Sequence, residues 1–357
     1  MDTKKFFFII SISIILLGLL FTFLNKDYSS DKEYDKLFSN IESTIDNVTR
    51  IEIENNSSII YLFKKNGLWV LPSYDDYPAD EEKIRSLLLA IVQLKVIDKK
   101  TNNAALHKNL GLSFPLEKNS YRVRLLGGEK NLISDFIIGK SSKHNSDFKY
   151  IRKFDNNQSW LFKNVFNIKE NEIDWSENSI LKVARWRIKS VKLENTKNKD
   201  KHIYIYKNKY SDQSFKLANI PKGFNLNSNF NLIAFSSLLE SVKKIDIKKS
   251  SINKNNNFIK NLYFETFDGL IINIKAFKIE GDIYYYFDID SDINVRKELN
   301  KSEANIVGLP NMLSFEEVRA EVIKYQYLED WLFKLYDDFN SDTNFILQDI
   351  ITQKQNN

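Results

Sequence analysis

The chain contains no cysteine, which excludes disulfide bonds, thiolate metal sites, cysteine nucleophiles and the acylated cysteine of a lipoprotein. Histidine is scarce: no two of His107, His144 and His202 have the i, i+4 spacing of a zinc-binding helix. Charge of one sign is not concentrated either, because the net charge of +5 is spread over 52 basic and 47 acidic residues. A nucleic-acid binder usually gathers its basic residues in a patch, so we expect no nucleic-acid partner.

Long hydrophobic runs are absent except for one, at residues 6–24, which reads FFFIISISIILLGLLFTFL. At a rise of about 1.5 Å per residue, this uncharged run spans the hydrocarbon core of a bilayer, roughly 30 Å thick. Lys4 and Lys5 precede it, and Lys26 and Asp27 cancel each other after it. The positive-inside rule then predicts a cytoplasmic N-terminus (1–5) and an extracytoplasmic main domain. The alternative is a cleaved signal peptide, but this run is long for one and LNKDYSS is a poor cleavage site. We therefore expect an uncleaved, single-pass signal-anchor.

The chain is long and apolar enough for two medium domains: it has 357 residues, of which 43% are hydrophobic and 13% aromatic. Segments of alternating polarity are followed by a segment of helical periodicity and then by two hairpins, and this order recurs about 140–148 residues later. The sequence predicts an α+β fold: an N-terminal transmembrane helix, then a duplicated unit of antiparallel strand meander, one helix and hairpins. The expected parts are a tether (25–45), a first repeat (46–165), a linker (166–185), a second repeat (186–295) and a C-terminal helical segment and tail (296–357).

Two helices define the predicted repeats, at Asp80–Ile97 and Asn231–Ile245. Trp69 and Phe215 are expected to be equivalent residues, each buried beneath its own helix. In the tail, Ser314 and Glu317 have the spacing of a capping box, which predicts another helix start.

Five carboxylates lie close together in GLWVLPSYDDYPADEEKI: Asp75, Asp76, Asp80, Glu81 and Glu82. A calcium loop needs alternating oxygen ligands with a glycine bend, and this stretch has neither. Asp80 stands just before an apolar helical stripe, and Glu81 and Glu82 fall in its first turn, where the helix dipole favours acids. The sequence therefore predicts a strand, a turn and a helix cap.

Four further segments have candidate chemistry, but each has a simpler structural interpretation. Ser141–Asp147 places Ser, His and Asp close only in sequence. LLGGEK is too short for a phosphate loop, because no G-K-[ST] motif and no helix follow it. Arg185, Trp186, Arg187 and Lys189 could touch anionic lipid or a partner, but we expect the solvated entry to a strand. Of the run Tyr284–Phe287, two residues should face the core, which leaves a small aromatic surface. The sequence predicts no catalytic, cofactor-binding or metal-binding residue.

The order of short motifs resembles a bacterial family catalogued as domain of unknown function 4340. The matching residues are Gly67, Trp69, Pro78, Ala79, Asp80, Leu110, Gly111, Leu112, Pro115, Ile138, Gly139, Tyr150 and Arg152, with Asp330–Leu335 as a later echo. The resemblance implies an N-terminal span, a repeated α+β extracytoplasmic part, and genes beside ABC-type transport systems similar to the gliding-motility kind. It implies no catalytic residues.

We therefore expect a non-enzymatic, membrane-anchored accessory or scaffold protein of a bacterial envelope complex. It would lie in the inner membrane through residues 6–24, with its main domain in the periplasm and an ABC-type transporter as its membrane partner. The alternative is a periplasmic ligand- or peptide-binding module. A periplasmic hydrolase is a third alternative, which the residues favour less because no catalytic constellation is visible.

Overall fold

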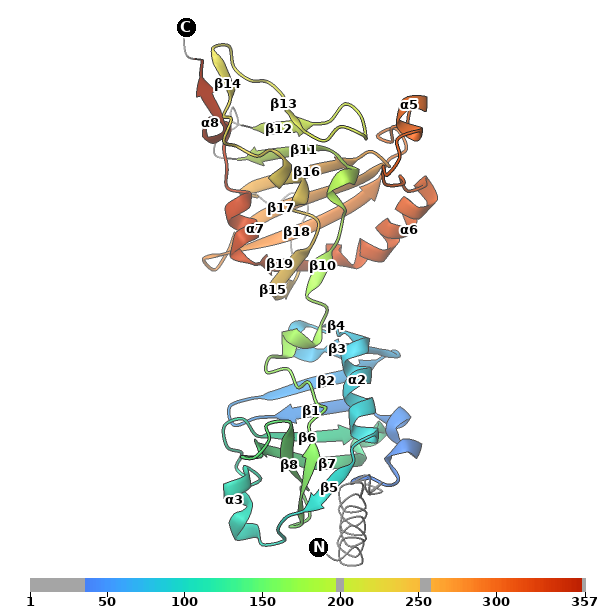
Figure 1. The fold of residues 1–357 in the computed structure, drawn as a ribbon, viewed down its shortest axis with the longest axis vertical. Coiled ribbons are helices and arrows are strands. Elements are labelled where there is room, and N and C mark those ends of the chain that lie inside the picture. Colours follow the sequence, from blue (N-terminus) through green and yellow to red (C-terminus); the bar gives the residue numbers. More distant parts are fainter. Residues whose placement is uncertain (1–35, 197–201, 251–257, 355–357) are drawn as a thin grey trace, which may run out of the picture.

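The computed structural model describes residues 36–196, 202–250 and 258–354, which form two lobes placed end to end (Figure 1). Each lobe is built on a nine-stranded antiparallel sheet, and a small two-stranded sheet lies near the C-terminus. The predicted α+β class is therefore wrong, because the described chain is mainly antiparallel β-sheet with few helices.

The predicted membrane span, residues 6–24, lies outside the described residues. Among the residues that are described, no helix is both long enough and apolar enough to cross a bilayer.

The first sheet has the strand order β4-β3-β2-β1-β6-β7-β8-β9-β5. Side chains alternate across it: Ile51 and Ile53 of the central strand are buried in the core, whereas Arg50 and Glu54 lie on the other face. The strands are β1 (Arg50–Glu54), β2 (Ile59–Lys65), β3 (Leu68–Leu71), β4 (Tyr77–Pro78), β5 (Val96–Lys99), β6 (Tyr121–Leu126), β7 (Leu132–Ser141), β8 (Phe148–Lys153) and β9 (Ser159–Lys163).

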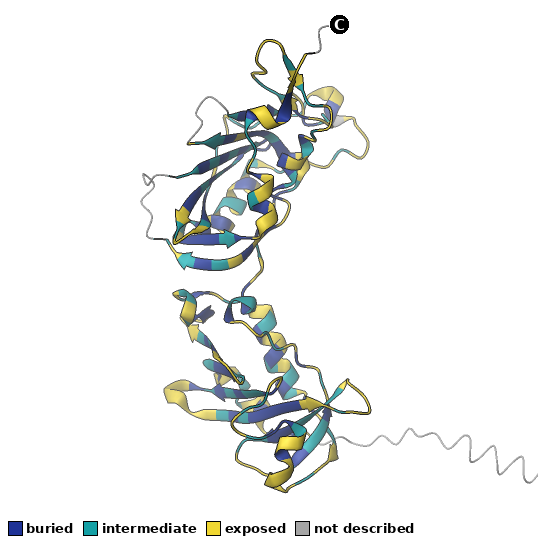
Figure 2. Ribbon diagram, turned by 90° about the vertical axis from the view of Figure 1, so that its left-hand side faces the viewer, coloured by how far each residue is buried: buried dark blue, intermediate teal, exposed yellow. Residues whose placement is uncertain are grey.

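Helix α2 (Glu81–Val92) covers the inner face of this sheet and buries Ile84, Leu87 and Ile91 (Figure 2). It ends five residues earlier than predicted, because the chain then enters β5 and pairs with β9. The β-branched Val96 and Ile97 favour this extended conformation.

The second sheet has the order β10-β15-β19-β18-β17-β16-β11-β12-β13. Its strands are β10 (Ser179–Leu181), β11 (Ile188–Asn195), β12 (Ile203–Tyr206), β13 (Lys216–Leu217), β15 (Val242–Lys249), β16 (Lys260–Thr266), β17 (Leu270–Ile279), β18 (Asp282–Ser291) and β19 (Trp331–Leu335). The remaining elements of the lobe are α4 (Ile233–Ser237), α5 (Lys301–Ala304), α6 (Phe315–Tyr325), α7 (Asp337–Asp342), α8 (Leu347–Ile350) and the strand pair β14 (Phe224–Leu226) with β20 (Ile351–Gln353).

Eight strands follow the same order in both sheets: β3-β2-β1-β6-β7-β8-β9-β5 in the first and β13-β12-β11-β16-β17-β18-β19-β15 in the second. The helix predicted at Asn231–Ile245 is nevertheless wrong. Only Ile233–Ser237 is helical, and β15 begins at Val242. Along β15, Val242, Lys244 and Ile247 are buried while Lys243 and Ile245 are exposed, so the segment follows the pattern of a strand.

Helix α6 begins as predicted, with the reciprocal hydrogen bonds of a capping box between Ser314 and Glu317. The segment that follows returns to the sheet: β19 lies between β15 and β18. The second lobe therefore takes one of its inner strands from the last 30 residues of the chain.

The lobes meet where β4 and the 3-10 helix η3 (Pro72–Tyr74) lie against β15 and β19. Tyr77 packs edge-on against Trp331 and Phe333, with ring centroids 4.9 and 6.2 Å apart. The linker is held to the first lobe by polar contacts as well: Ser73 Oγ donates to Glu172 (2.7 Å), and Lys83 Nζ donates to the carbonyl oxygen of Ser176 (2.7 Å).

Candidate functional site

The acidic stretch before α2 is a turn and a cap, as the sequence predicts. The Asp80 carboxylate accepts hydrogen bonds from the backbone N–H groups of Glu82 (3.0 Å) and Lys83 (3.2 Å). Asp76 pairs with Lys65 Nζ at 2.7 Å on the surface. No group of three or more metal-ligating side chains is found among the described residues.

The other polar candidates occupy separate places in the first lobe. His107 is buried, and its Nε2 lies 2.8 Å from the carbonyl oxygen of Asn157, whereas His144 is exposed in the loop between β7 and β8. Ser141–Asp147 forms that loop and the end of β7, and Gly127 and Gly128 form the turn between β6 and β7.

Two candidates in the second lobe are more buried than predicted. All four residues of the run Tyr284–Phe287 are buried, since Tyr284 and Tyr286 pack with Phe277 and Leu332 on the far face of the sheet. The run therefore offers no exposed aromatic surface.

Arg187 was expected at a solvated strand entry, but it is also buried. Its Nε donates to Asp268 and its Nη2 to Glu321, each at 2.7 Å. Its neighbour Trp186 is 44% exposed. Arg187 is therefore a structural residue.

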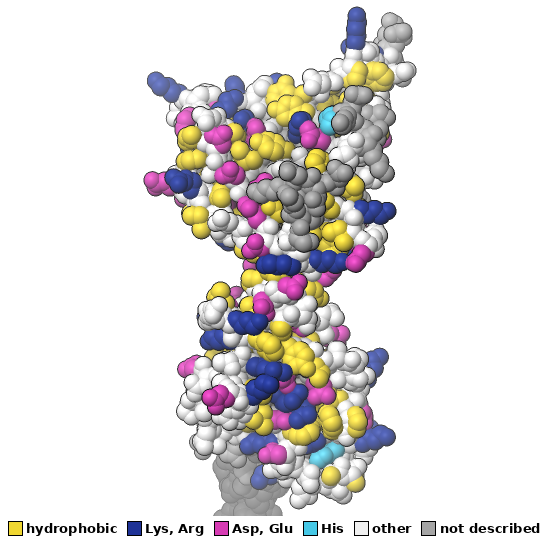
Figure 3. All heavy atoms as spheres, turned by 180° about the vertical axis from the view of Figure 1, so that it is seen from behind, with side chains coloured by type: hydrophobic (Ala, Val, Ile, Leu, Met, Phe, Trp, Pro, Cys, Tyr) yellow, Lys and Arg dark blue, Asp and Glu magenta, His cyan; other side chains and the backbone are white. Residues whose placement is uncertain are grey.

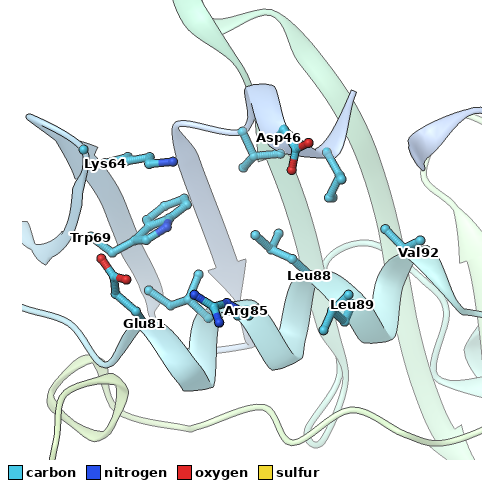
Figure 4. A pocket seen from close by; sticks show the side chains of 12 residues that line it. Asp46, Lys64, Trp69, Glu81, Arg85, Leu88, Leu89 and Val92 are labelled. Atoms are coloured by element: carbon cyan, nitrogen blue, oxygen red, sulfur yellow. The ribbon is translucent and has the colours of Figure 1, made fainter. Parts of the chain in front are cut away.

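The feature best suited to binding is a pocket of about 370 Å³ on the first lobe, between α2, the strands β2 and β3, and the 3-10 helix η2 (Ile45–Asn47). Figure 4 shows Lys64 and Trp69 entering it from the strands, Asp46 from η2, and Leu88, Leu89 and Val92 from α2. The walls are mostly apolar, and they comprise Ile45, Val48, Trp69, Ile84, Leu88, Leu89 and Val92. Small-molecule and peptide side-chain sites are commonly apolar hollows of this kind with a few polar groups.

Charges of both signs stand at the rim of this pocket: Lys64, Arg85, Asp46 and Glu81. Within the part of the chain that the structure describes, none of the four forms an ion pair. Leu89, beside them, is 50% exposed. An apolar hollow whose rim charges form no ion pair among the described residues can hold an apolar group and also hydrogen-bond the polar atoms attached to it.

The opposite face of the first sheet is also rich in charge (Figure 3). There Glu52 is only 3% exposed and pairs with Arg50 and with Arg124, the latter at 2.5 Å. The Arg50 guanidinium lies 5.1 and 4.8 Å from the ring centroids of Tyr61 and Phe63. Because these side chains compensate one another, this face is stabilised internally and is the weaker candidate.

A larger cleft of about 520 Å³ lies at the junction of the lobes and is lined by Asp80, Glu81, Glu82, Glu177 and Tyr327, among others. Asp80 already caps α2 there. The lining of the cleft is acidic, and two of the acids already have partners: Asp80 pairs with Lys83 (3.5 Å) and Glu177 with Lys182 (4.0 Å). The pocket beside α2 is the better candidate.

Several of the motif residues that resemble the family, among them Gly139, Leu110, Leu112 and Arg152, contact one another in the fold. An added Cβ on Gly139 would lie 2.2 Å from the carbonyl oxygen of Leu110, so only glycine fits between β7 and α3 (His107–Leu110). Arg152 is buried and its Nε donates to the carbonyl oxygen of Leu112 at 2.7 Å. The motifs therefore fix a loop against the sheet.

Comparison with known proteins agrees with this resemblance. Residues 69–257 match the family model described as Domain of unknown function (DUF4340). The chain belongs to this family, which is an uncharacterised one. No curated protein and no solved structure matches the chain.

Sequence reasoning identified Trp69 but missed the pocket, because its walls come from three segments between residues 45 and 92. One signal was available. Leu89 lies outside the apolar stripe of α2, and an apolar residue on the outer face of a helix often marks contact with something else.

Proposed function

We propose that this protein is a membrane-anchored, non-catalytic accessory or scaffold protein of a bacterial envelope complex, with an ABC-type transport system as its membrane partner. Residues 6–24 would anchor it in the inner membrane, and both lobes would lie in the periplasm. Family membership supports this role, since the resemblance implies such genetic neighbours. The observation that carries the proposal is the apolar pocket on the first lobe, whose rim charges form no ion pair among the described residues.

A second candidate, a periplasmic ligand- or peptide-binding module, is favoured by the same pocket. The two candidates differ in the occupant: a scaffold would hold a protein partner there permanently, whereas a binding module would exchange a free ligand.

Site-specific photo-crosslinking in cells tests the proposal. A photoreactive amino acid is placed at Leu89, at the mouth of the pocket, and a matched one at Ile323, which is 72% exposed on the second lobe. We expect a discrete adduct with a membrane protein from position 89 and a much weaker one from position 323. The absence of an adduct at 89, or equal labelling from both positions, would contradict docking through the first lobe.

A further inference from the structure

Lys64 on β2 and Lys207, which directly follows β12, occupy corresponding places in the two sheets. The backbone N–H of Lys64 donates to the carbonyl oxygen of Thr49. In the same way, the backbone N–H of Lys207 donates to the carbonyl oxygen of Lys189. These acceptors stand at the starts of β1 and β11, which occupy the same position in the shared strand order.

Each lysine also has a large aromatic neighbour on the next strand. Lys64 pairs with Trp69 across β2 and β3. Phe215 directly precedes β13, and the Lys207 ammonium lies 5.3 Å from its ring centroid. Trp69 and Phe215 are buried to a similar degree, 7% and 8% exposed.

The second lobe satisfies its lysine from within. Lys207 is 6% exposed, and its Nζ donates to the carbonyl oxygen of Trp186 at 3.2 Å. A second ring, that of Phe267, lies 5.4 Å from the same ammonium. The chain itself thus supplies two aromatic faces and one oxygen acceptor, which are the groups that stabilise a desolvated ammonium.

In the first lobe, the corresponding lysine, Lys64, is exposed to solvent. Lys64 is exposed at the rim of the pocket, with Trp69 as its only aromatic neighbour among the pocket's lining residues. The short helix before the first strand, η2, contributes Ile45 and Asp46 to the opposite wall, whereas its counterpart η7 (Arg185–Arg187) supplies the carbonyl oxygen to Lys207. Among the described residues, the Lys64 ammonium therefore has neither a carbonyl acceptor nor a second ring like those of Lys207, although the carboxylates of Asp46 and Glu81 stand at the same rim.

We propose that the pocket binds an aromatic side chain of a peptide segment from a protein partner, with an adjacent carbonyl or carboxylate oxygen accepting from Lys64. The ring would pack against Trp69 and Leu88, as aromatic anchors do at the centres of protein interfaces. Arg85 stands as a second donor at the same rim. This inference rests on the proposed function and specifies the chemistry of the partner at that site.

Binding of small probes to the full chain, held in lipid nanodiscs and labelled with 5-fluorotryptophan, tests the inference. N-acetyl-phenylalanine carries a ring and a carboxylate, phenethylamine carries the ring and a cation, and octanoate carries a carboxylate on an acyl chain. We expect N-acetyl-phenylalanine to shift the fluorine resonance of Trp69 saturably, with a Kd about tenfold below that of phenethylamine. Lys64→Gln should remove most of this preference, whereas Lys99→Gln, at an exposed position of β5, should retain it.

Each other outcome overturns the inference. Absence of a saturable shift, or an unchanged preference in Lys64→Gln, would remove the proposed role of the lysine. Octanoate binding as tightly as N-acetyl-phenylalanine would make the pocket a site for amphiphiles. A Leu89 crosslink in cells together with failed probe binding would defeat this inference alone, whereas probe binding without any crosslink would defeat the proposed function.

Discussion

The ring of Tyr77 on β4 packs edge-on against Trp331 on β19, with the centroids 4.9 Å apart and the planes at 83°. The two residues are separated by most of the chain, and their edge-to-face contact joins the lobes. Close by, the ammonium of Lys244 lies 5.4 Å from the Tyr77 ring centroid, and burial lowers the pKa of this lysine to about 8. No strand of the described chain is shared between the two nine-stranded sheets, so side-chain contacts such as these hold the lobes together at the junction.

Removing the aromatic contact should uncouple the lobes. Tyr77 is 3% exposed, so Tyr77→Ala should cost about 3–5 kcal/mol of stability and split thermal unfolding into two transitions. Calorimetry of the purified chain measures both effects. Tyr77→Phe keeps the ring and should retain one transition. A single transition at an unchanged temperature in Tyr77→Ala would show that the linker alone holds the lobes together.

Trp69 should be essential to the first lobe, because it belongs to the core, lines the pocket and is only 7% exposed. Trp69→Ala should cost about 3–5 kcal/mol in the free energy of unfolding, as for other buried aromatic residues. Trp69→Phe should cost much less, since most of the buried area remains. Denaturant titration followed by circular dichroism gives both values, and a loss below about 1 kcal/mol in the alanine variant would be inconsistent with the observed packing.

The cap of α2 predicts a contrast between neighbouring acids. Asp80→Ala should cost about 1 kcal/mol, because two backbone N–H groups lose their acceptor. Asp76→Asn should stay within about 0.5 kcal/mol, since its ion pair with Lys65 is exposed. Calcium at millimolar concentration should leave the melting temperature unchanged. A calcium-dependent rise that Asp76→Asn abolishes would revive the metal-site hypothesis.

The buried Lys260 predicts a pH dependence. It is 4% exposed, its Nζ donates to the Thr343 hydroxyl at 2.9 Å, and burial lowers its pKa to about 8. Between about pH 8 and the usual lysine pKa near 10.4, the unfolded chain holds more protons than the folded chain, so stability rises with pH in this window. Below about pH 8 the full cost of burying the charge is present.

Chemical denaturation at pH 7.5 and 9.5 tests this dependence. Lys260→Met should be more stable than the parent at pH 7.5, by at most about 3 kcal/mol, and the advantage should shrink at pH 9.5. Lys99→Met, at an exposed lysine, should show neither effect. An advantage that is independent of pH would mean that Lys260 keeps its ordinary pKa in the folded protein.

The predicted orientation in the membrane can be tested directly. A reporter that is active only outside the cytoplasm, fused after Asn357, should be active, because Lys4 and Lys5 hold the N-terminus inside. The same fusion with a reporter active only in the cytoplasm should be silent. The reverse pattern would place both lobes in the cytoplasm and contradict the proposed role in an envelope complex.

Local features of the fold were predictable from the sequence. The cap at Asp80 and the capping box between Ser314 and Glu317 depend on residues within three positions of each other, so a short window contains their cause. The alternation that marks β1 and β2 is equally local. The motifs that resemble the family could also be recognised from the sequence, because each is a short, continuous segment.

Tertiary contacts decided the rest. The segment around Val242 has apolar residues compatible with a helix, but pairing with β10 and β19, 60 to 90 residues away, makes it a strand. Trp331–Leu335 is likewise extended because it pairs with β15 and β18 on either side. The pocket beside α2 depends on how α2, β2, β3 and η2 pack, and the different fates of Lys64 and Lys207 depend on which carbonyl oxygen lies within reach. The sequence by itself determined the caps and turns, because those bonds close within a few residues. Only the folded chain determined the strand order and the pocket, because they arise from segments that the sequence keeps far apart.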